Sequence, residues 1–73
     1  MDIVVLLGRR VREERQLKGL SQEQLALDAD MKRSYLSDLE RGTRNPSLKA
    51  IGRIAEALGV PASSLLEAGN SKR

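Results

Sequence analysis

Apolar residues recur along this chain at the spacing of amphipathic helices, in short segments separated by glycine or proline. Gly19, Gly42 and Gly59 each follow such a segment, and glycine just past the last periodic residue is a common helix end. No segment alternates β-branched and polar residues as a half-buried strand does. The pattern therefore predicts five helices, at about residues 3–18, 22–29, 33–41, 48–58 and 61–66.

Residues suited to helix starts precede four of these segments. Asp2 and Ser47 precede the first and fourth, where a short side-chain oxygen can accept from free backbone N–H groups. Ser21 precedes the second, and Gln24 three residues later is expected to complete a capping box. Pro61 opens the last segment, since proline is tolerated at a first helical position. Short connections between five helices predict a compact all-α bundle.

The apolar stripes of these helices define an expected core. A chain of 73 residues has no room for a second core, so we expect one domain over residues 1–68 and a frayed tail over 69–73. The expected core residues are Leu7, Val11, Leu17, Leu25, Ala26, Met31, Tyr35, Leu36, Leu39, Leu48, Ile51, Ile54, Ala55 and Leu58.

The composition excludes several kinds of chemistry. The chain has no cysteine and no histidine, so it lacks thiolate metal ligands, disulfides and the commonest general base. No glycine-rich phosphate loop and no convincingly placed carboxylate pair are present. We expect no enzymatic activity, no metal, no cofactor and no small-molecule ligand. The apolar run from Ile3 to Leu7 is far shorter than the roughly 20 residues that cross a bilayer, so we expect a cytoplasmic protein without membrane contact.

Positive charge is concentrated in the middle of the chain. Thirteen Lys and Arg against ten Asp and Glu give a net charge of only +3. Between Lys32 and Arg53, however, six cations face only two anions, Asp38 and Glu40. Tyr35 is the single aromatic residue, which disfavours binding of single strands by base stacking. The distribution favours double-stranded nucleic acid as a partner.

The second and third helices form a helix-turn-helix unit, in which two short helices are joined by about three residues. Asp30 occupies the crowded turn position, and aspartate tolerates a positive φ better than most residues. Met31 beside it is expected to pack under the turn. A unit of this kind places its second helix in the major groove of DNA, so the segment from Ser21 to Gly42 is the candidate recognition element.

Polar side chains gather at the start of the third helix, opposite Leu36 and Leu39. Arginine can contact guanine with two bonds, serine can reach either kind of base edge, and aspartate can accept from cytosine N4. Asp38 has a second interpretation, which is to orient a neighbouring cation. An exposed polar face also occurs in helix pairs of repeat proteins and adaptors. The expected base-reading residues are Lys32, Arg33, Ser34, Ser37 and Asp38.

An ordered set of motifs resembles the Cro/C1-type (XRE-family, lambda-repressor-like) helix-turn-helix domains of phage repressors. The similarity runs from about Leu6 to Leu66, and the order and spacing of the motifs are highly specific. Glu14 departs from the family pattern where an apolar residue is usual, and Asp30 departs where glycine is common. The matching motifs are Leu6-Leu7-Gly8 with Arg15, Gly19 to Ala26, Arg33 to Ser37, Glu40-Arg41-Gly42, Arg44 to Leu48, and Ala57 to Pro61.

The resemblance implies a role for each matched position. Gln22 would contact a phosphate and brace the recognition helix. Arg15 would pair with Glu40 and tie the first helix to the third. Tyr35 would contact the DNA backbone or help to sense a deformable base step, with plain packing as an equal alternative. The residues implied to lie along the phosphates are Gln22, Tyr35, Arg41, Thr43, Arg44, Asn45 and Ser47.

Within this family, the chain looks most like the controller proteins of restriction–modification systems, which are small dimeric regulators. The shared features are the length, Arg33-Ser34-Tyr35 at the start of the recognition helix, and the pair Arg44-Asn45. The resemblance implies a transcriptional regulator that binds double-stranded DNA of specific sequence. Stand-alone phage repressors and antitoxins share these motifs and remain alternatives, as does a protein-interaction module on the same fold.

Apolar residues at the two ends of the domain exceed what one small core can bury. All five residues from Ile3 to Leu7 are apolar, and one helix face cannot bury them all. Leu65 and Leu66 add a second surplus. One interpretation is that the first run covers the last helix of the same chain. The other is a homodimer interface that includes Ile3, Val4, Leu65 and Leu66, with a palindromic operator whose half-sites lie about 10 bp apart.

Overall fold

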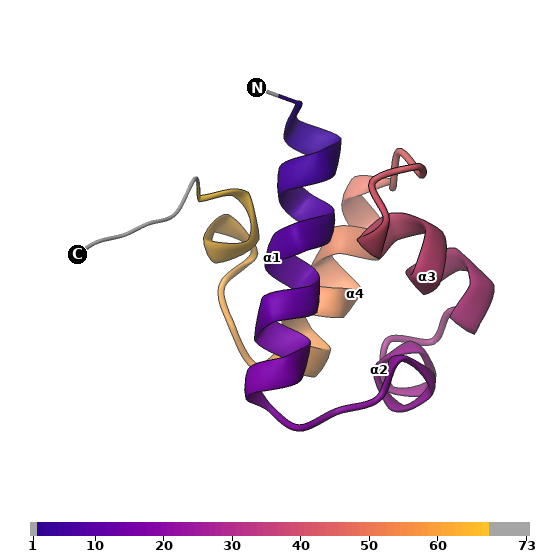
Figure 1. Ribbon diagram of the computed structural model, residues 1–73. Helices are drawn as coiled ribbons and strands as arrows, with labels where there is room; N and C mark the ends of the chain where they lie inside the picture. Colours follow the sequence, from indigo (N-terminus) through magenta and orange to yellow (C-terminus); the bar gives the residue numbers. More distant parts are fainter. Residues whose placement is uncertain (1, 68–73) are drawn as a thin grey trace.

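A computed structural model of the protein describes residues 2–67, and this part of the chain is all-helical. Figure 1 shows the long first helix standing beside a group of three shorter ones, with the last segment on its other side. The elements are α1 (Ile3–Leu17), α2 (Gln22–Asp28), α3 (Arg33–Glu40), α4 (Leu48–Leu58) and the 3₁₀ helix η1 (Ala62–Leu66). The all-α expectation is confirmed, and the tail expected at residues 69–73 lies outside the described residues.

The fifth expected helix is a short 3₁₀ segment, so the described residues form four α-helices and one 3₁₀ helix where five helices were expected. The backbone N–H of Ser64 donates to the Pro61 carbonyl at 3.0 Å, which is the short-range bond of a 3₁₀ turn. The Ser64 hydroxyl donates to the same carbonyl at 2.8 Å. A five-residue segment cannot offset the cost of nucleating an α-helix, and the serine side chain competes for the backbone partner.

The expected caps form at three helix starts. Asp2 accepts from the backbone N–H of Val4 at 2.9 Å, Ser21 from that of Gln24 at 3.0 Å, and Ser47 from that of Ala50 at 3.1 Å. The second half of the predicted capping box is wrong. The amide of Gln24 donates to Asp28 one turn further along α2, at 3.0 Å, because residues four apart share one helix face.

The core lies where the four α-helices and η1 meet. Two expected core residues are instead exposed: Leu17 by 78% and Leu48 by 83%. Leu17 is the last residue of α1 and Leu48 the first of α4, so both stand beyond the packed part of their helices. The buried hydrophobic residues are Leu6, Leu7, Val11, Leu25, Ala26, Ala29, Leu36, Leu39, Ala50, Ile54, Ala55, Leu58 and Leu65, with Met31, Tyr35 and Ile51 partly buried against them.

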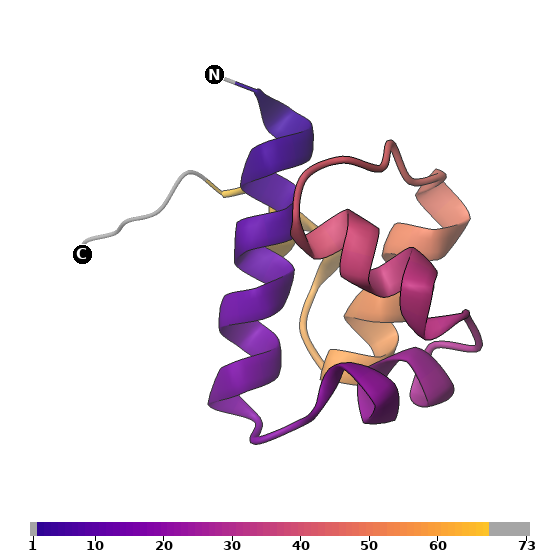
Figure 2. The same cartoon turned by 45° about the vertical axis from the view of Figure 1, so that its right-hand side comes forward.

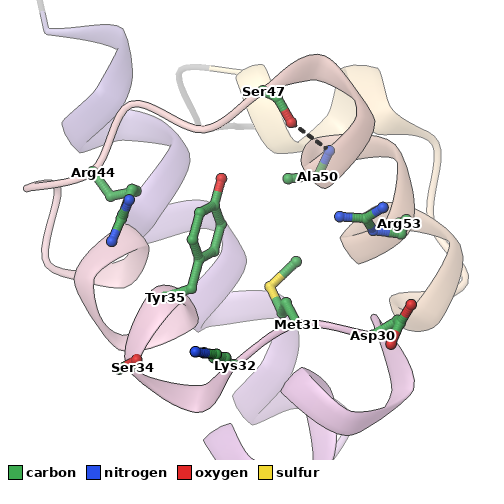
Figure 3. Close-up of a pocket in the computed structure, with 9 residues that line it drawn as sticks. All are labelled: Asp30, Met31, Lys32, Ser34, Tyr35, Arg44, Ser47, Ala50 and Arg53. Atoms are coloured by element: carbon green, nitrogen blue, oxygen red, sulfur yellow. Dashed lines mark hydrogen bonds between the residues drawn. The ribbon is translucent and has the colours of Figure 1, made fainter.

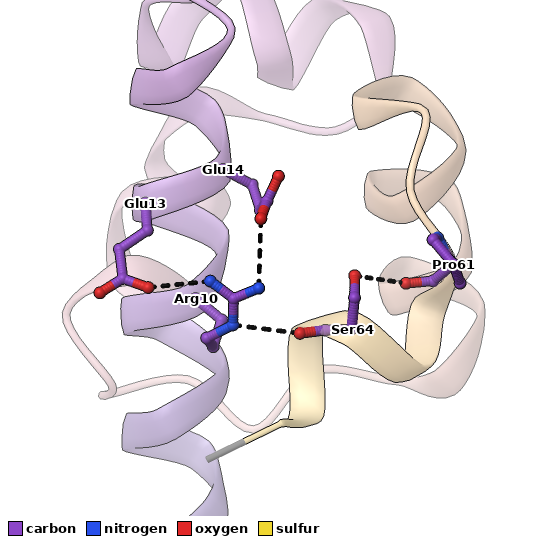
Figure 4. Close-up of polar contacts among 5 residues, drawn as sticks. All are labelled: Arg10, Glu13, Glu14, Pro61 and Ser64. Atoms are coloured by element: carbon purple, nitrogen blue, oxygen red, sulfur yellow. Dashed lines mark hydrogen bonds and ion pairs between the residues drawn. The ribbon is translucent and has the colours of Figure 1, made fainter. Parts of the chain in front are cut away.

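The polar residue that interrupts the stripe of α1 belongs to a network that ties α1 to η1 (Figure 4). Arg10 donates to Glu14 at 3.1 Å, to Glu13 at 2.9 Å and to the main-chain carbonyl of Ser64 at 3.1 Å. The hydrogen bond with Glu13 is the main cause that raises the pKa of the Arg10 guanidinium above its ordinary value. Glu14 is thus accommodated at the edge of the core because it has a charged partner.

The apolar surplus at the ends is divided between core and surface. Leu6 and Leu7 are buried, whereas Ile3 and Val5 are 56% and 51% exposed. Leu65 is fully buried within the same chain, so its assignment to a dimer interface is wrong. Leu66 is 39% exposed and Val4 is half-buried. No helix within residues 2–67 has the length and apolar character needed to span a membrane.

Candidate nucleic-acid interface

The turn between α2 and α3 sets the direction of the candidate recognition helix. Asp30 has φ +57°, the left-handed conformation expected at this position, and no other non-glycine residue of the described chain has a positive φ. The backbone N–H of Met31 donates to the Ala26 carbonyl at 2.9 Å, which closes the end of α2. The Met31 side chain is half-buried against the core, and Lys32 then occupies the N-cap position of α3 without a side-chain capping bond.

Helix α3 buries one side and leaves the other open to solvent. Leu36 and Leu39 are at most 1% exposed, so they fix the rotation of the helix about its axis. The residues on the open side form the reading edge, a name we use for Lys32, Arg33, Ser34 and Ser37. Of these, Lys32, Arg33 and Ser34 are exposed and Ser37 is half-buried. At eight residues the helix is about 12 Å long, a size that a major groove admits.

A buried ion pair holds the far end of α3. Glu40 accepts from Arg15 through two bonds, at 2.7 Å from Nε and 3.0 Å from Nη2. Gln22 donates to the same carboxylate at 3.1 Å, and Arg15 also donates to the Leu20 carbonyl at 2.8 Å. The side chains of Arg15 and Glu40 are only 11% and 3% exposed. Helices α1, α2 and α3 therefore meet at one carboxylate.

The guanidinium of this pair stays charged. The hydrogen bond with Glu40 raises the pKa of Arg15 above its ordinary value, against the opposing effect of burial. The geometry agrees with both structural roles that the resemblance implied, namely the tie between Arg15 and Glu40 and the brace from Gln22. The bond to Glu40 uses one of the two N–H donors of the Gln22 amide, and the contact of Gln22 with a phosphate remains a prediction.

A close approach of two backbones fixes where α3 crosses α1. A Cβ atom built on Gly8 would lie 2.3 Å from the Leu39 carbonyl oxygen and 2.8 Å from that of Glu40. Only glycine allows two helices to come this near. The position of α3 is consequently defined by three independent contacts: its apolar face, the Glu40 ion pair and the Gly8 crossing.

The loop after α3 is organised by Asp38. Its carboxylate contacts Arg41 through one oxygen and lies 3.6 Å from Arg44 Nη2 through the other. Its main-chain carbonyl accepts from the backbone N–H of Thr43 at 3.0 Å and from the Thr43 hydroxyl at 3.1 Å. This is the geometry of the second interpretation of Asp38, in which it orients neighbouring cations. Arg41 also donates to Ser37 at 3.0 Å.

A concavity with a volume of about 390 Å³ lies between the start of α3 and the start of α4 (Figure 3). The guanidinium of Arg44 lies 4.6 Å from the centroid of the Tyr35 ring, within the range of a cation–π interaction. Tyr35 thus both packs against the core and borders this surface. We name the surface the basic concavity and define it by Asp30, Met31, Lys32, Ser34, Tyr35, Arg44, Ser47, Ala50 and Arg53.

Arg53 is a member of the basic concavity that the expected site did not include. The signal was present in the sequence, because Ser47, Ala50 and Arg53 are three residues apart and lie near one face of α4. With Lys32 and Arg44, Arg53 places three cations around the concavity. Thr43, Asn45 and Ser47 are exposed along the adjoining loop. The arrangement suits a polyanion that runs past the start of α4, where backbone N–H groups also favour negative charge.

The fold and the arrangement of these side chains are those of a helix-turn-helix protein, and the chain belongs to the helix-turn-helix family, which matches residues 11–65. Control protein C.BamHI from Bacillus amyloliquefaciens is 49% identical over 67 residues, which cover 90% of this chain and 83% of that protein. The crystal structure of the restriction-modification controller protein C.AhdI from Aeromonas hydrophila has a TM-score of 0.83 at 47% identity, over 85% of this chain and 94% of that one.

Phage proteins are also among the relatives. The immunity repressor protein of Bacillus phage phi105 is 42% identical over 60 residues, which cover 82% of this chain but only 42% of the repressor. The XRE-type resemblance recognised in the sequence is therefore confirmed. The relatives that this chain matches along most of their length include restriction-modification control proteins.

Proposed function

We propose that this chain is a transcriptional regulator that binds double-stranded DNA of specific sequence, with α3 in the major groove. The observation that carries the proposal is the placement of the reading edge. It lies on the open side of a helix that is fixed by a buried ion pair, next to the basic concavity. A rigid polar helix edge flanked by cations can read base edges while neighbouring groups hold phosphates.

The proposed contacts divide into readers and anchors. The residues of the reading edge, Lys32, Arg33, Ser34 and Ser37, read base edges. The anchors hold the phosphates from both sides of α3 and include Arg53 as an addition from the structure. The proposed anchors are Gln22, Tyr35, Arg41, Thr43, Arg44, Asn45, Ser47 and Arg53.

The relatives favour one kind of regulator. The similarity to C.BamHI and C.AhdI extends over at least 83% of each of those proteins, whereas it covers 42% of the phage repressor. We therefore propose that the chain acts as the controller protein of a restriction–modification system, working in the cytoplasm. A phage-type repressor or antitoxin is the alternative within the same class.

A homodimer is part of the proposal. Ile3, Val5 and Leu66 leave apolar surface exposed at one end of α1 and at η1, the two elements that pack together. With Val4 half-buried beside them, these side chains form the proposed interface. A domain this small buries only about 60% of its unfolded surface, so a second copy would add stability.

The decisive experiment measures the affinity for duplex DNA across a series of salt concentrations. A DNA regulator should select a palindromic sequence from a random pool. The logarithm of its binding constant should fall with the logarithm of salt at a slope near −0.9 per phosphate contacted. Salt-independent binding, or no preference among duplexes, would contradict the proposal and favour a protein-interaction module.

A further inference from the structure

Asp38 carries a carboxylate on the proposed DNA-facing surface that remains within reach of solvent and phosphates. The segment from Lys32 to Arg53 contains two anions, Asp38 and Glu40. Glu40 is 3% exposed and bonded to Arg15 and Gln22, so it is removed from the surface. The Asp38 side chain is 33% exposed. Asp30, which lines the basic concavity, is a second exposed carboxylate on this surface, but Asp38 is the one that contacts two of its arginines.

This carboxylate is shared by two arginines that the proposed function assigns to phosphates. One oxygen contacts Arg41 and the other lies 3.6 Å from Arg44. Both arginines are well exposed, by 62% and 46%, so DNA can reach them in the positions they hold. An arginine that contacts a phosphate from this position must leave Asp38 or bring the phosphate close to a like charge. Either event reduces the gain from the contact.

We infer that Asp38 is a selectivity residue, which competes with DNA phosphates for Arg41 and Arg44 and so weakens binding to DNA of arbitrary sequence. This inference rests on the proposed function. Phosphate contacts supply essentially all of the affinity for non-specific DNA, so a competitor for phosphate-binding arginines acts there most directly.

The weakening is smaller on a matching sequence. Asp38 lies four residues after Ser34 and so shares a face of α3 with this member of the reading edge, and a helix seated in the major groove brings its carboxylate toward the base edges. A cytosine or adenine there presents an amino group that can donate to the carboxylate, in place of the arginines. A duplex without such a group leaves the carboxylate unpaired. Asp38 therefore opposes all duplexes but opposes mismatched ones more strongly.

The test compares wild type with Asp38→Asn and Glu67→Gln on two duplexes. One duplex has random sequence, and the other is the sequence that wild type selects from a random pool. Asparagine keeps the size of the side chain and the main-chain carbonyl that Thr43 uses. Glu67 is exposed and directly follows η1, a segment that lies across α1 from α3 in Figure 1, so its substitution makes the same change in net charge away from the site.

Asp38→Asn should bind random duplex about three- to tenfold tighter than wild type, because two exposed ion pairs no longer compete. Its salt slope on random duplex should steepen by up to about 1.8, which corresponds to two phosphate contacts. The selected duplex should gain less, so the ratio of the two affinities falls. Adding Arg41→Gln and Arg44→Gln to Asp38→Asn should abolish the gain, and Glu67→Gln should match wild type on both duplexes.

Four results would overturn the inference alone: equal binding of random duplex by wild type and Asp38→Asn, an equal gain on both duplexes, a loss confined to the selected duplex, or the same gain from Glu67→Gln. The third result would make Asp38 a simple base reader, and the fourth would make net charge the cause. Failure of wild type to bind any duplex in a salt-dependent way would instead overturn the proposed function. An unchanged unfolding midpoint of Asp38→Asn shows that its fold is intact.

Discussion

Two arginines of the interface differ in their surroundings, and this difference defines their expected roles. Arg33 lies exposed in the first turn of α3, at the reading edge. Arg44 lies against the Tyr35 ring and close to Asp38, on the loop that precedes α4. A side chain free to follow a base edge and one held beside the path of the phosphates should contribute differently to affinity and to specificity.

Arg33→Ala should weaken binding to the selected sequence by about 1–3 kcal/mol and relax the preference at one base pair. Arg33→Lys is the matched control, because it keeps the charge but loses the two-pronged contact to guanine. It should restore binding to random duplex without restoring the preference. Equal losses on random and selected duplexes would show that Arg33 is an anchor rather than a reader.

Arg44→Ala should weaken binding to both duplexes, and less on random duplex, where Asp38 competes with the phosphates for this arginine. Its salt slope on the selected duplex should be shallower by about 0.9, since one phosphate contact is lost. Titrations of both duplexes at several salt concentrations measure this directly. A change of sequence preference at one base pair would contradict the assignment of Arg44 to the phosphates.

Glu40→Ala should lower the free energy of unfolding by about 3 kcal/mol, because it leaves the Arg15 guanidinium largely buried without its partner. Urea unfolding measures the loss. Glu13→Gln is the control, since Glu13 is 49% exposed in a pair with Arg10 and should cost below about 0.5 kcal/mol. Because the pKa of Arg15 is raised, its contribution is complete below the ordinary arginine pKa and is lost only above it.

At the scale of single residues, the sequence predicted which residue types form the site better than it predicted which side chains contact one another. The family resemblance implied that Arg15 pairs with Glu40, and the structure contains that ion pair. Asp38 had two interpretations, since a sequence does not show that Arg41 and Arg44 return to it across a loop. The hydrogen bond from Arg10 to the Ser64 carbonyl joins positions 54 residues apart, and no local sequence pattern predicts such a contact.

At the scale of elements, the sequence predicted where helices begin, but it did not predict whether the residues at helix termini are buried. Aspartate and serine caps act within three residues, so Asp2, Ser21 and Ser47 could be recognised locally. Whether a terminal leucine is buried depends on how far a helix extends past its neighbours, which is a tertiary property. Leu17 and Leu48 continue apolar stripes but lie outside the bundle.

Two helix glycines offer a sharp test of the crossing between α1 and α3. Gly8→Ala would place a Cβ atom against two backbone carbonyl oxygens, so the helices must separate. We expect a loss of stability of about 2 kcal/mol or more, together with weaker DNA binding. Gly52→Ala in α4 meets nothing within 4 Å and should gain about 0.5–1 kcal/mol. Thermal unfolding of both variants measures the contrast, and equal shifts would contradict the close crossing.

At the scale of the whole molecule, the dimensions suit a pair of copies on one face of DNA. The domain measures 31 × 23 × 18 Å. Two copies side by side can therefore place their recognition helices about 34 Å apart, which is one turn of the double helix. The apolar surplus of the sequence left a homodimer interface and cover within the same chain as alternatives, and only the structure showed that Leu65 is buried in the monomer's own core.

Ile3→Ser should shift the protein from dimer to monomer without unfolding it, since Ile3 is 56% exposed in the single chain. Sedimentation at micromolar concentration measures the change, and circular dichroism checks the fold. Leu48→Ser is the matched control, because Leu48 is also an exposed apolar residue but lies at the start of α4, outside the proposed interface. If Leu48→Ser alone dissociates the dimer, the interface lies along α4. A monomeric wild type, with and without DNA, would contradict the dimer.

The carboxylate of Glu40 has a consequence for the time course of binding. Helices α1, α2 and α3 are joined at that one group, and Figure 2 shows the end of α3 beside α1. We therefore expect α3 to be in place before DNA arrives. Association then has little conformational entropy to lose and no slow rearrangement to await. Stopped-flow traces should show a single phase whose rate rises linearly with DNA concentration. In Glu40→Gln, a loosened α3 should add a second phase that reaches a plateau.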